Sequence, residues 1–308
     1  MEVADTIHGP MELVGGPQDL ICRSLRETGE WGQTEIAIFA AALSGRDFVW
    51  DAGAFIGTFS LGVRQLTGAR VLAIEPDQQA AAALGRNLAA NAGGGFQVVR
   101  KALGATEGMM RPVPCTSEDN RGTQRFEPAG TGYPGGAAVP CTTLARLRGE
   151  FGDYTALKLD IEGGEFEALR ADARFIRQTR PLVWAECNEA AQVKALLGFF
   201  LWAGLDPVYV AFPAFRRAGY RNGAAPIYPI AYEAAICGGG RGQFRDLGDN
   251  FGGEEIITRP LASFQDLKQA MWDTPRWGRE DWARMSRAEL IARLGRMQRG
   301  ESFGTFLA

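Results

Sequence analysis

Residues 48–57 read FVWDAGAFIG, and this stretch decides the fold. An apolar run is followed by Asp51 and by a turn that contains Gly53 and Gly57, and a helical pattern begins directly afterwards. Glycines let the backbone turn sharply and approach a ligand, and the start of a helix offers unpaired N–H groups. The stretch therefore predicts a strand, a turn that binds a polar ligand and a helix, in that order.

Similar apolar runs recur along the chain, separated by stretches of helical period. Alternation of this kind is typical of β-α-β units and predicts a mostly parallel sheet with helices on both faces. We expect seven strands, the last of them antiparallel and at the edge. The runs are 48–53, 69–76, 96–102, 155–163, 180–186, 207–212 and 229–237.

The composition is that of an ordinary globular protein, with 308 residues, 46% apolar residues and a formal net charge of −3. This balance excludes disorder and coiled coil and carries no electrostatic footprint of a bulk nucleic-acid binder. No apolar run approaches the roughly 18 residues needed to span a bilayer, and no secretory signal opens the chain, so we expect a cytoplasmic protein without a membrane span. Arginine greatly outnumbers lysine, which favours a GC-rich bacterial source. The five cysteines include no C-x-x-C pair and predict neither a zinc site nor a disulfide framework.

The chain divides into an N-terminal segment at 1–32, a domain at 33–240 and an extension at 241–308. Residues 104–142, rich in Gly, Pro and Thr, are too long for a simple connection and predict an insertion, either a small hairpin with a loop or a flap. In the extension, Ser286 and Glu289 predict a capping box for an amphipathic helix. Its apolar stripe must be covered by the domain or by a second copy of the chain, so a homo-oligomer is one expectation; the stripe is Leu290, Ile291, Leu294 and Met297.

Glu75 follows the second apolar run, at the tip of a strand next to the glycine turn. A carboxylate there can accept hydrogen bonds from both hydroxyls of a ribose, although a solvated charge at a strand end is the simpler alternative. A dinucleotide fingerprint, G-x-G-x-x-G, would need glycines where Phe55 and Thr58 stand. A NAD-dependent dehydrogenase is therefore disfavoured.

The densest group of charges is KLDIEGGE at 158–165. Strand alternation puts Lys158, Asp160 and Glu162 on one side of the chain, and Glu165 falls at the opening of the next helix. Such crowded carboxylates need a ligand, a cation or a raised pKa, and this edge of an open α/β sheet is where ligands bind. Capping and solvation remain the alternative, most of all for Glu165.

Five elements, VWDAGAFIG, VLAIEPD, VPCTTL, LKLDIEGGEFEAL and RPLVWAE, occur in this order. In order and spacing they resemble the FkbM-type branch of the class I S-adenosylmethionine (SAM)-dependent methyltransferases, over roughly residues 33–240. The resemblance implies a Rossmann-like fold with a seven-stranded sheet, and SAM as cofactor. It also implies O-methylation of a hydroxyl on a sugar, a glycolipid or a polyketide-like natural product.

The resemblance also implies which residues bind the cofactor. Gly53, Ala54 and Gly57 would line the SAM loop with Asp51 nearby, Glu75 would hold the ribose hydroxyls, and Asp160 would border the methionine part of SAM and the acceptor. Two positions depart from the family. Phe55 stands where the family usually has Asn, and Ala145 stands where an Asp commonly follows the Thr-Leu pair.

A hydroxyl acceptor needs a base or a metal to take up its proton. The only histidine, His8, lies in the N-terminal segment, where we expect a flexible or surface position. A carboxylate base is favoured, with Asp160, Glu162 and Glu186 as candidates. A divalent cation is compatible with these oxygen ligands, but no motif requires one, and we name no metal ligands. Two alternatives stay open: a methyltransferase acting on nitrogen, and a non-catalytic protein of the same fold.

Overall fold

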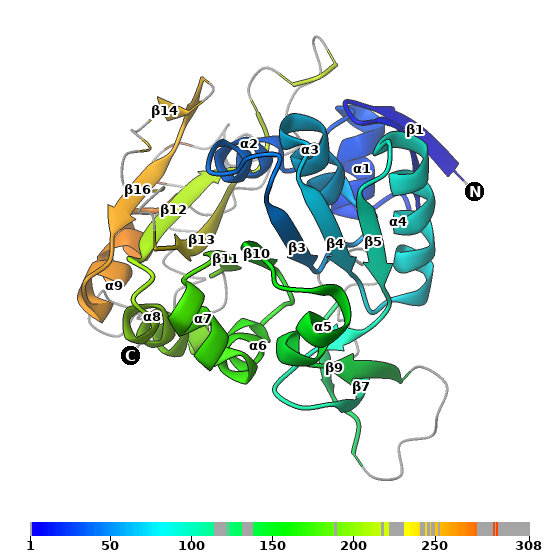
Figure 1. Cartoon of the computed structure of the whole chain (residues 1–308). Helices are drawn as coiled ribbons and strands as arrows, with labels where there is room; N and C mark the ends of the chain where they lie inside the picture. Colours follow the sequence, from blue (N-terminus) through cyan, green and yellow to red (C-terminus); the bar gives the residue numbers. More distant parts are fainter. Residues whose placement is uncertain are drawn as a thin grey trace.

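The structure is a computed structural model of the whole chain (Figure 1). It describes residues 2–113, 122, 124–130, 138–187, 190–216, 219–221, 231–240, 244, 247, 250–251, 253–275, 286 and 288. The amphipathic helix expected after Ser286 lies outside these residues, and so does Cys115. The other four cysteines are buried free thiols: Cys22, Cys141, Cys187 and Cys237.

Eight strands form the central sheet of the described chain: β3 (Phe48–Ala52), β4 (Arg70–Ile74), β5 (Phe96–Val99), β10 (Ala156–Leu159), β11 (Leu182–Glu186), β12 (Val208–Pro213), β13 (Tyr232–Gly238) and β16 (Ile257–Pro260). Their order is β16-β12-β13-β11-β10-β3-β4-β5. The run from β11 to β5 is parallel, and the remaining pairings are antiparallel. The predicted Rossmann-like α/β fold is confirmed. The edge position predicted for β13 is wrong, because β12 and β16 continue the sheet beyond it.

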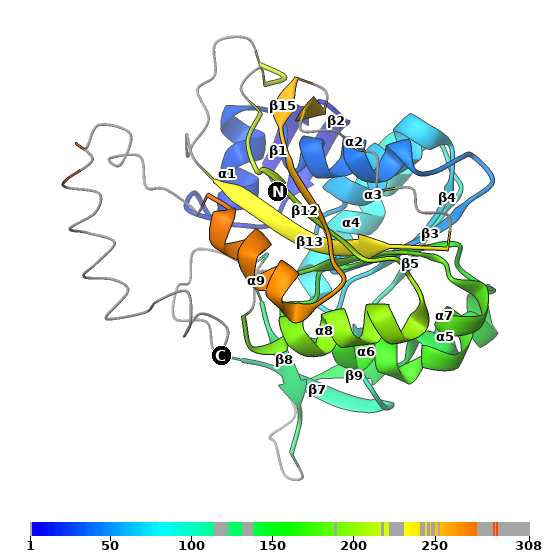
Figure 2. The same ribbon diagram turned by 90° about the vertical axis from the view of Figure 1, so that its left-hand side faces the viewer.

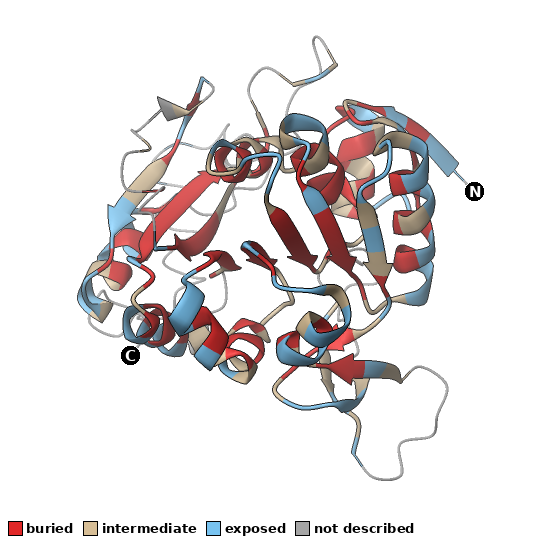
Figure 3. Cartoon of the chain, in the orientation of Figure 1, coloured by how far each residue is buried: buried red, intermediate tan, exposed pale blue. Residues whose placement is uncertain are grey.

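Helices cover both faces of this sheet (Figure 2). One face carries α1 (Leu20–Glu27), α2 (Gln33–Ala41), α3 (Thr58–Thr67) and α4 (Gln78–Asn91), and the other carries α5 (Leu144–Phe151), α6 (Glu165–Ala171), α7 (Ala173–Thr179) and α8 (Ala190–Ala203). Successive strand residues point to opposite faces, so Val49 joins one core and Trp50 the other. Figure 3 shows the resulting burial of the central strands.

The helix α4 begins directly after the tip of β4. Asp77 caps it, with its side chain accepting hydrogen bonds from the backbone N–H groups of Gln79 and Ala80. The Ala-rich sequence that follows has high helix propensity, and the helix ends before the glycines at 93–95. This sharp transition from strand to helix presents the strand tip, and Glu75 with it, to the sheet edge.

The N-terminal segment forms a hairpin of β1 (Glu2–Thr6) and β2 (Gly9–Leu13) that packs on α4. His8, in its turn, is buried, and its ring nitrogens lie 2.9 Å from Gln65 Oε1 and 2.8 Å from Gln33 Nε2. The expectation of a flexible or surface position for His8 is therefore wrong. Burial lowers the pKa of this imidazole, so it is a neutral structural bridge.

The insertion between β5 and α5 is a small sheet with the order β6-β9-β7-β8. Its strands are β6 (Ala102–Leu103), β7 (Gly108–Pro112), β8 (Phe126–Pro128) and β9 (Val139–Thr142). It projects below the carboxyl edge of the central sheet in the view of Figure 1. A hairpin was one of the two expectations, and β7 with β8 does form an antiparallel pair.

The chain after residue 240 is joined to the central fold through β16, which pairs with β12. It also contains β14 (Asn250–Phe251), β15 (Glu254–Glu255) and α9 (Phe264–Asp273). A capping box between Ser263 and Asp266 starts α9, whose Leu267 and Met271 pack into the core of one sheet face. Among the described residues, no helix has the length and apolar character that crossing a membrane requires.

Candidate active site

The turn after β3 connects three strand tips. The backbone N–H groups of Gly53 and Ala54 donate to the carbonyl oxygen of Ile74 at 3.0 and 3.1 Å. Gly53 has a φ of +83°, and a Cβ at this position would lie only 1.7 Å from the carbonyl oxygen of Asp160. Only glycine allows so close an approach between the turn and the end of β10. Gly57, with a φ of +99°, then begins α3.

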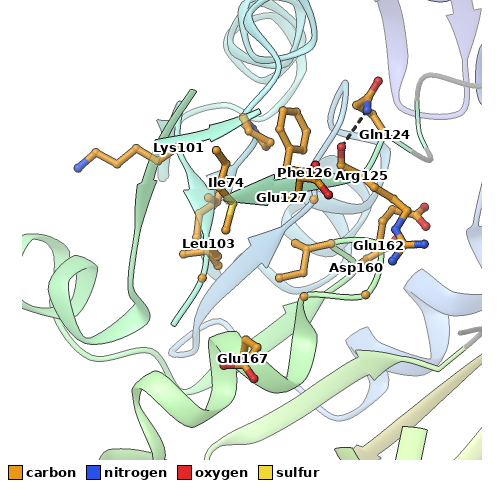
Figure 4. Close-up of a pocket in the computed structure, with 18 of the residues that line it drawn as sticks. Ile74, Lys101, Leu103, Gln124, Arg125, Phe126, Glu127, Asp160, Glu162 and Glu167 are labelled. Carbon is orange, nitrogen blue, oxygen red and sulfur yellow. Dashed lines mark hydrogen bonds between the residues drawn. The ribbon is translucent and has the colours of Figure 1, made fainter. Parts of the chain in front are cut away.

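A cavity of about 620 Å³ opens at the carboxyl ends of β3, β4 and β10. The strand ends form one wall, and the insertion sheet forms the other, with side chains such as Leu103 and Phe126 (Figure 4). Of the residues predicted to bind the cofactor, Gly53, Glu75 and Asp160 line this cavity. The fold therefore brings together residues that are up to 107 positions apart in the sequence.

Three other residues assigned to cofactor binding, Asp51, Ala54 and Gly57, lie behind this wall and do not line the cavity. Asp51 is fully buried, and its Oδ2 accepts a hydrogen bond from Ser60 Oγ at 2.6 Å. Burial raises the pKa of this carboxyl, and the Lys158 ammonium opposes the rise. Asp51 thus lies near the glycine turn without lining the cavity, and the assignment of Ala54 and Gly57 to the cofactor stays a prediction.

Glu75 is buried at the tip of β4, and both of its carboxylate oxygens are held by the backbone. Oε2 accepts from the N–H of Phe55 at 2.9 Å, and Oε1 accepts from the N–H of Asp77 at 2.8 Å. Burial raises the pKa of Glu75 to about 7, although these two hydrogen bonds favour the charged form. A carboxylate oxygen has two lone-pair sites, so each oxygen keeps one acceptor site for a ligand hydroxyl.

Phe55 lines the same cavity with an unusual backbone. Its φ is +46°, in the left-handed region that a bulky residue rarely adopts and that Asn adopts more readily. The N–H of this strained residue is the group that holds Glu75 Oε2. The departure from Asn therefore places strain in the turn and leaves the backbone donor in position.

Lys158 lies among the carboxylates of Asp51, Asp160 and Glu35. It is a neighbour of Asp51 in the pairing of β10 with β3, and its Nζ lies 2.8 Å from Asp160 Oδ2. Only 5% of the Lys158 side chain is exposed. Burial alone would lower the pKa of this ammonium, but the carboxylates of Asp160 and Glu35 outweigh it and raise the pKa. Lys158 therefore stays charged at neutral pH.

The three residues proposed as catalytic, Asp160, Glu162 and Glu186, form one cluster. Each offers a carboxylate oxygen, and these oxygens all lie within 4.8 Å of one another. Burial, followed by the charges of Asp160 and Glu162, raises the pKa of Glu186 well above its usual value. For Asp160, the raising effect of burial is outweighed by the Lys158 ammonium and by a hydrogen bond from Glu186, so its pKa is lowered. The two shifts are opposite, so Glu186 is the member of the pair that binds a proton more readily.

The turn after β10 is held by Glu165. Its Oε1 accepts from the backbone N–H groups of Ile161 at 3.0 Å and Gly163 at 3.2 Å. Between them, Glu162 adopts a φ of +58°, a strained conformation that concentrates at functional sites. Glu165 thus fixes the turn before α6, while Glu162 lines the cavity.

The carboxylate cluster also has the oxygen ligands that a hard cation prefers. The Lys158 ammonium, 2.8 Å from Asp160 Oδ2, already offsets part of the negative charge of the cluster.

Sequence reasoning missed Glu35, Arg125 and Gln192. Glu35 lies in the first turn of α2. Its Oε1 accepts a hydrogen bond at 2.8 Å from Nε1 of Trp184, a residue 149 positions further along the chain. Burial raises its pKa to about 7, with the Lys158 ammonium opposing the rise. Arg125 and Gln192 line the cavity from the insertion and from α8. No local pattern marks these three positions, because only the tertiary fold brings them to the strand tips.

The profile of the methyltransferase FkbM domain family matches residues 51–221. The match covers more than half of the chain, so the chain belongs to this family, whose members are methyltransferases. No functionally curated protein matches the chain.

Solved structures are similar at low identity. The methyltransferase FkbM from Methylobacillus flagellatus KT is 19% identical, with a TM-score of 0.39, and the match covers 64% of this chain and 44% of that one. The precorrin-6y C5,15-methyltransferase from Geobacter metallireducens GS-15 is 13% identical, with a TM-score of 0.41 and coverage of 67% and 86%. The SAM-dependent methyltransferase from Agrobacterium tumefaciens is 12% identical, with a TM-score of 0.38 and coverage of 66% and 59%.

Proposed function

We propose that the protein is a SAM-dependent O-methyltransferase that acts on a hydroxyl of a sugar, a glycolipid or a polyketide-like natural product. The observation that carries the proposal is a cavity, in a member of the FkbM methyltransferase family, beside which one strand tip carries a carboxylate held by two backbone N–H groups and another carries a cluster of three carboxylates. The acceptor is then a small molecule or a glycan, not a nucleic acid. A cytoplasmic location and a homo-oligomer formed through the extension belong to the same proposal.

The residues present fit SAM. The cavity is lined by Glu75, Asp160 and Glu162, whose negative charge suits a sulfonium cation. Gly53 removes the side chain that would block the approach between the β3 turn and the end of β10. Glu75, fixed by two backbone N–H groups, would hold the ribose hydroxyls, and Asp160 would border the methionine part. When bound, SAM supplies a strongly activated methyl group.

The cluster supplies the base in this proposal. Within the pair, the pKa of Asp160 is lowered and that of Glu186 is raised, so Asp160 is the carboxylate to which we assign the proton of the acceptor hydroxyl. Lys158 balances the charge of Asp160 before that transfer. Glu162 lies within reach of both and orients the hydroxyl. The proposed reaction therefore needs no divalent cation.

Methyl transfer from radiolabelled SAM to a panel of hydroxylated small molecules tests the proposal. We expect label on an oxygen of at least one acceptor, and a loss of turnover of roughly 100-fold or more in Asp160→Asn, as for removal of a general base. Glu27→Gln, on the exposed surface of α1, is the matched control and should keep full activity. Label on an acceptor nitrogen favours the N-methylating alternative. A folded protein that binds no SAM favours the non-catalytic one.

A further inference from the structure

The end of the cavity beyond Glu162 carries two nitrogen donors that converge on Gly163. Arg125 Nη2 lies 3.3 Å, and Gln192 Nε2 lies 3.7 Å, from the position that a Cβ on Gly163 would take. Figure 4 shows Arg125 extending from the insertion wall toward the side of the cavity where Asp160 and Glu162 lie. Because Gly163 has no side chain, both donors face open space above its backbone.

Among the described cationic side chains that line the cavity, one has no protein partner. Most charged side chains of the lining already have partners at their own positions: Lys101 with Glu150 at 3.9 Å, Glu127 with Arg111, Asp160 with Lys158 at 2.8 Å, and Glu167 with Arg170 at 2.6 Å. Arg125 is exposed, and its guanidinium makes no hydrogen bond or ion pair with any residue that the structure describes. A guanidinium without a protein partner, inside a cavity, is a receptor for an anion.

Gln192 adds a second and independent sign of a ligand. Its Oε1 is buried and has no hydrogen-bond partner among the described residues. A buried acceptor without a partner costs stability unless a ligand or water supplies a donor. The Nε2 of the same amide lies toward Gly163 and can donate to an oxygen atom next to the anion.

We propose that Arg125 and Gln192 form an acceptor subsite above Gly163 that binds a carboxylate, so that the acceptor is a hydroxylated acid of about the size of a sugar acid. This proposal rests on the proposed function and names its substrate class. Glu162 directly precedes Gly163 and belongs to the carboxylate cluster. A compact hydroxy acid held by Arg125 therefore presents a neighbouring hydroxyl to that cluster.

Binding to the protein saturated with S-adenosylhomocysteine tests the subsite. The probes are D-glucuronate and its neutral counterpart D-glucuronamide, titrated by calorimetry into wild type, Arg125→Gln and Arg125→Lys. We expect wild type to bind the acid roughly ten-fold or more tightly than the amide, as for a hydrogen bond to a charged group. Arg125→Gln should abolish this preference, and Arg125→Lys should retain part of it. Arg259→Gln, at an exposed arginine that bonds only a backbone carbonyl, is the matched control.

Equal binding of acid and amide by wild type would overturn the subsite, and so would a preference that survives in Arg125→Gln. A fall in S-adenosylhomocysteine affinity in Arg125→Gln with an unchanged preference for the acid would assign the guanidinium to the cofactor's carboxylate and also overturn the proposal. Failure of the proposed function is read separately: wild type that does not bind S-adenosylhomocysteine is not a SAM-dependent enzyme, and label on an acceptor nitrogen in the methyl-transfer assay shows an N-methyltransferase.

Discussion

Carboxylates at two parts of the carboxyl edge of the sheet have opposite surroundings. At the tip of β4, Glu75 accepts hydrogen bonds from two backbone N–H groups and sits against the strained turn at Phe55. At the tips of β10 and β11, Glu186 instead faces the carboxylates of Asp160 and Glu162. Burial raises the pKa of both Glu75 and Glu186; at Glu75 two backbone N–H groups oppose the rise, whereas at Glu186 the charges of Asp160 and Glu162 add to it.

The different surroundings suit Glu75 to ligand binding and the Asp160–Glu186 pair to proton transfer. Backbone donors cannot move away or titrate, so the carboxylate of Glu75 keeps a fixed orientation toward the cavity, in which it can accept from neutral hydroxyls. Crowded carboxylates instead share a proton whose position responds to a neighbouring cation or ligand, as in other paired acids. The same residue type thus serves two purposes, according to whether backbone N–H groups or other acids surround it.

The largest expected effect is a loss of stability when Gly53, which packs against the backbone of Asp160, is replaced. In Gly53→Ala, the new Cβ would clash with the carbonyl oxygen of Asp160, which belongs to the backbone and cannot rotate away. The positive φ adds strain, so we expect a loss of about 4 kcal/mol or more in the free energy of unfolding. Urea denaturation measures it. Gly85→Ala, in open space within α4, is the control and should stabilise by up to about 1 kcal/mol.

The next largest expected effect is a change in the pH dependence of stability when Glu75 is replaced. The pKa of Glu75 is about 7 in the folded chain and 4.5 in the unfolded reference, so the folded protein keeps this proton longer. Wild-type stability without ligand should therefore fall as pH rises from about 4.5 to 7. In Glu75→Gln this fall should shrink by roughly 3 kcal/mol between pH 4 and pH 8, because a shift of about 2.5 pKa units is removed. Identical pH profiles of unfolding for the two proteins would contradict this.

The Asp160–Glu186 pair should make the protein less stable when the Lys158 ammonium is removed. Lys158→Met leaves Asp160 without its partner, and since 34% of the Asp160 side chain is exposed, the cost should be about 2 kcal/mol at pH 7, below that of a fully buried pair. Without the ammonium, the folded-state pKa of Asp160 rises above its unfolded value. The cost should therefore disappear below about pH 4 and grow as pH rises. Lys158→Arg keeps the charge and should recover part of the stability at pH 7.

The smallest expected effect is that of a divalent cation. Because the Lys158 ammonium already offsets part of the cluster's charge, 10 mM Mg²⁺ should leave the thermal midpoint nearly unchanged, and EDTA should not reduce methyl transfer. A magnesium site with a dissociation constant 100-fold below the added concentration would instead raise stability by about 2.7 kcal/mol. Such a rise in wild type, absent from Glu186→Gln, would assign the cluster to a metal.

Sequence patterns predicted the strand tips well because local rules determine them. The Asp51-to-Gly57 turn, Glu75 after its apolar run and the alternation around Asp160 all follow from residue spacing, and the predicted fold has them at one sheet edge. The role of Gly53 against Asp160 could not be predicted in this way, because the contact spans 107 positions. Which strand-tip residues face the cavity and which lie behind it, as Asp51 does, also depends on the tertiary fold.

The second wall of the site was less predictable. The strands of the insertion are short and separated by Gly- and Pro-rich stretches, so they show little periodicity. Arg125 and Gln192 meet over Gly163 only because the insertion and α8 both pack near the end of β10. His8 was placed wrongly for a related reason, since its burial depends on Gln65 and Gln33, which lie far along the chain.

The most direct test of the central claim is calorimetric titration of the purified protein with SAM, S-adenosylhomocysteine and NAD, repeated on Glu75→Ala and on the surface control Glu27→Ala. We predict micromolar binding of both SAM and S-adenosylhomocysteine to wild type and to the control, with no heat from NAD. In Glu75→Ala, affinity should fall by roughly ten-fold or more, because a charged acceptor of the ribose hydroxyls is lost. Absence of binding to folded wild type, or equal affinity in Glu75→Ala, would contradict the cofactor site described above.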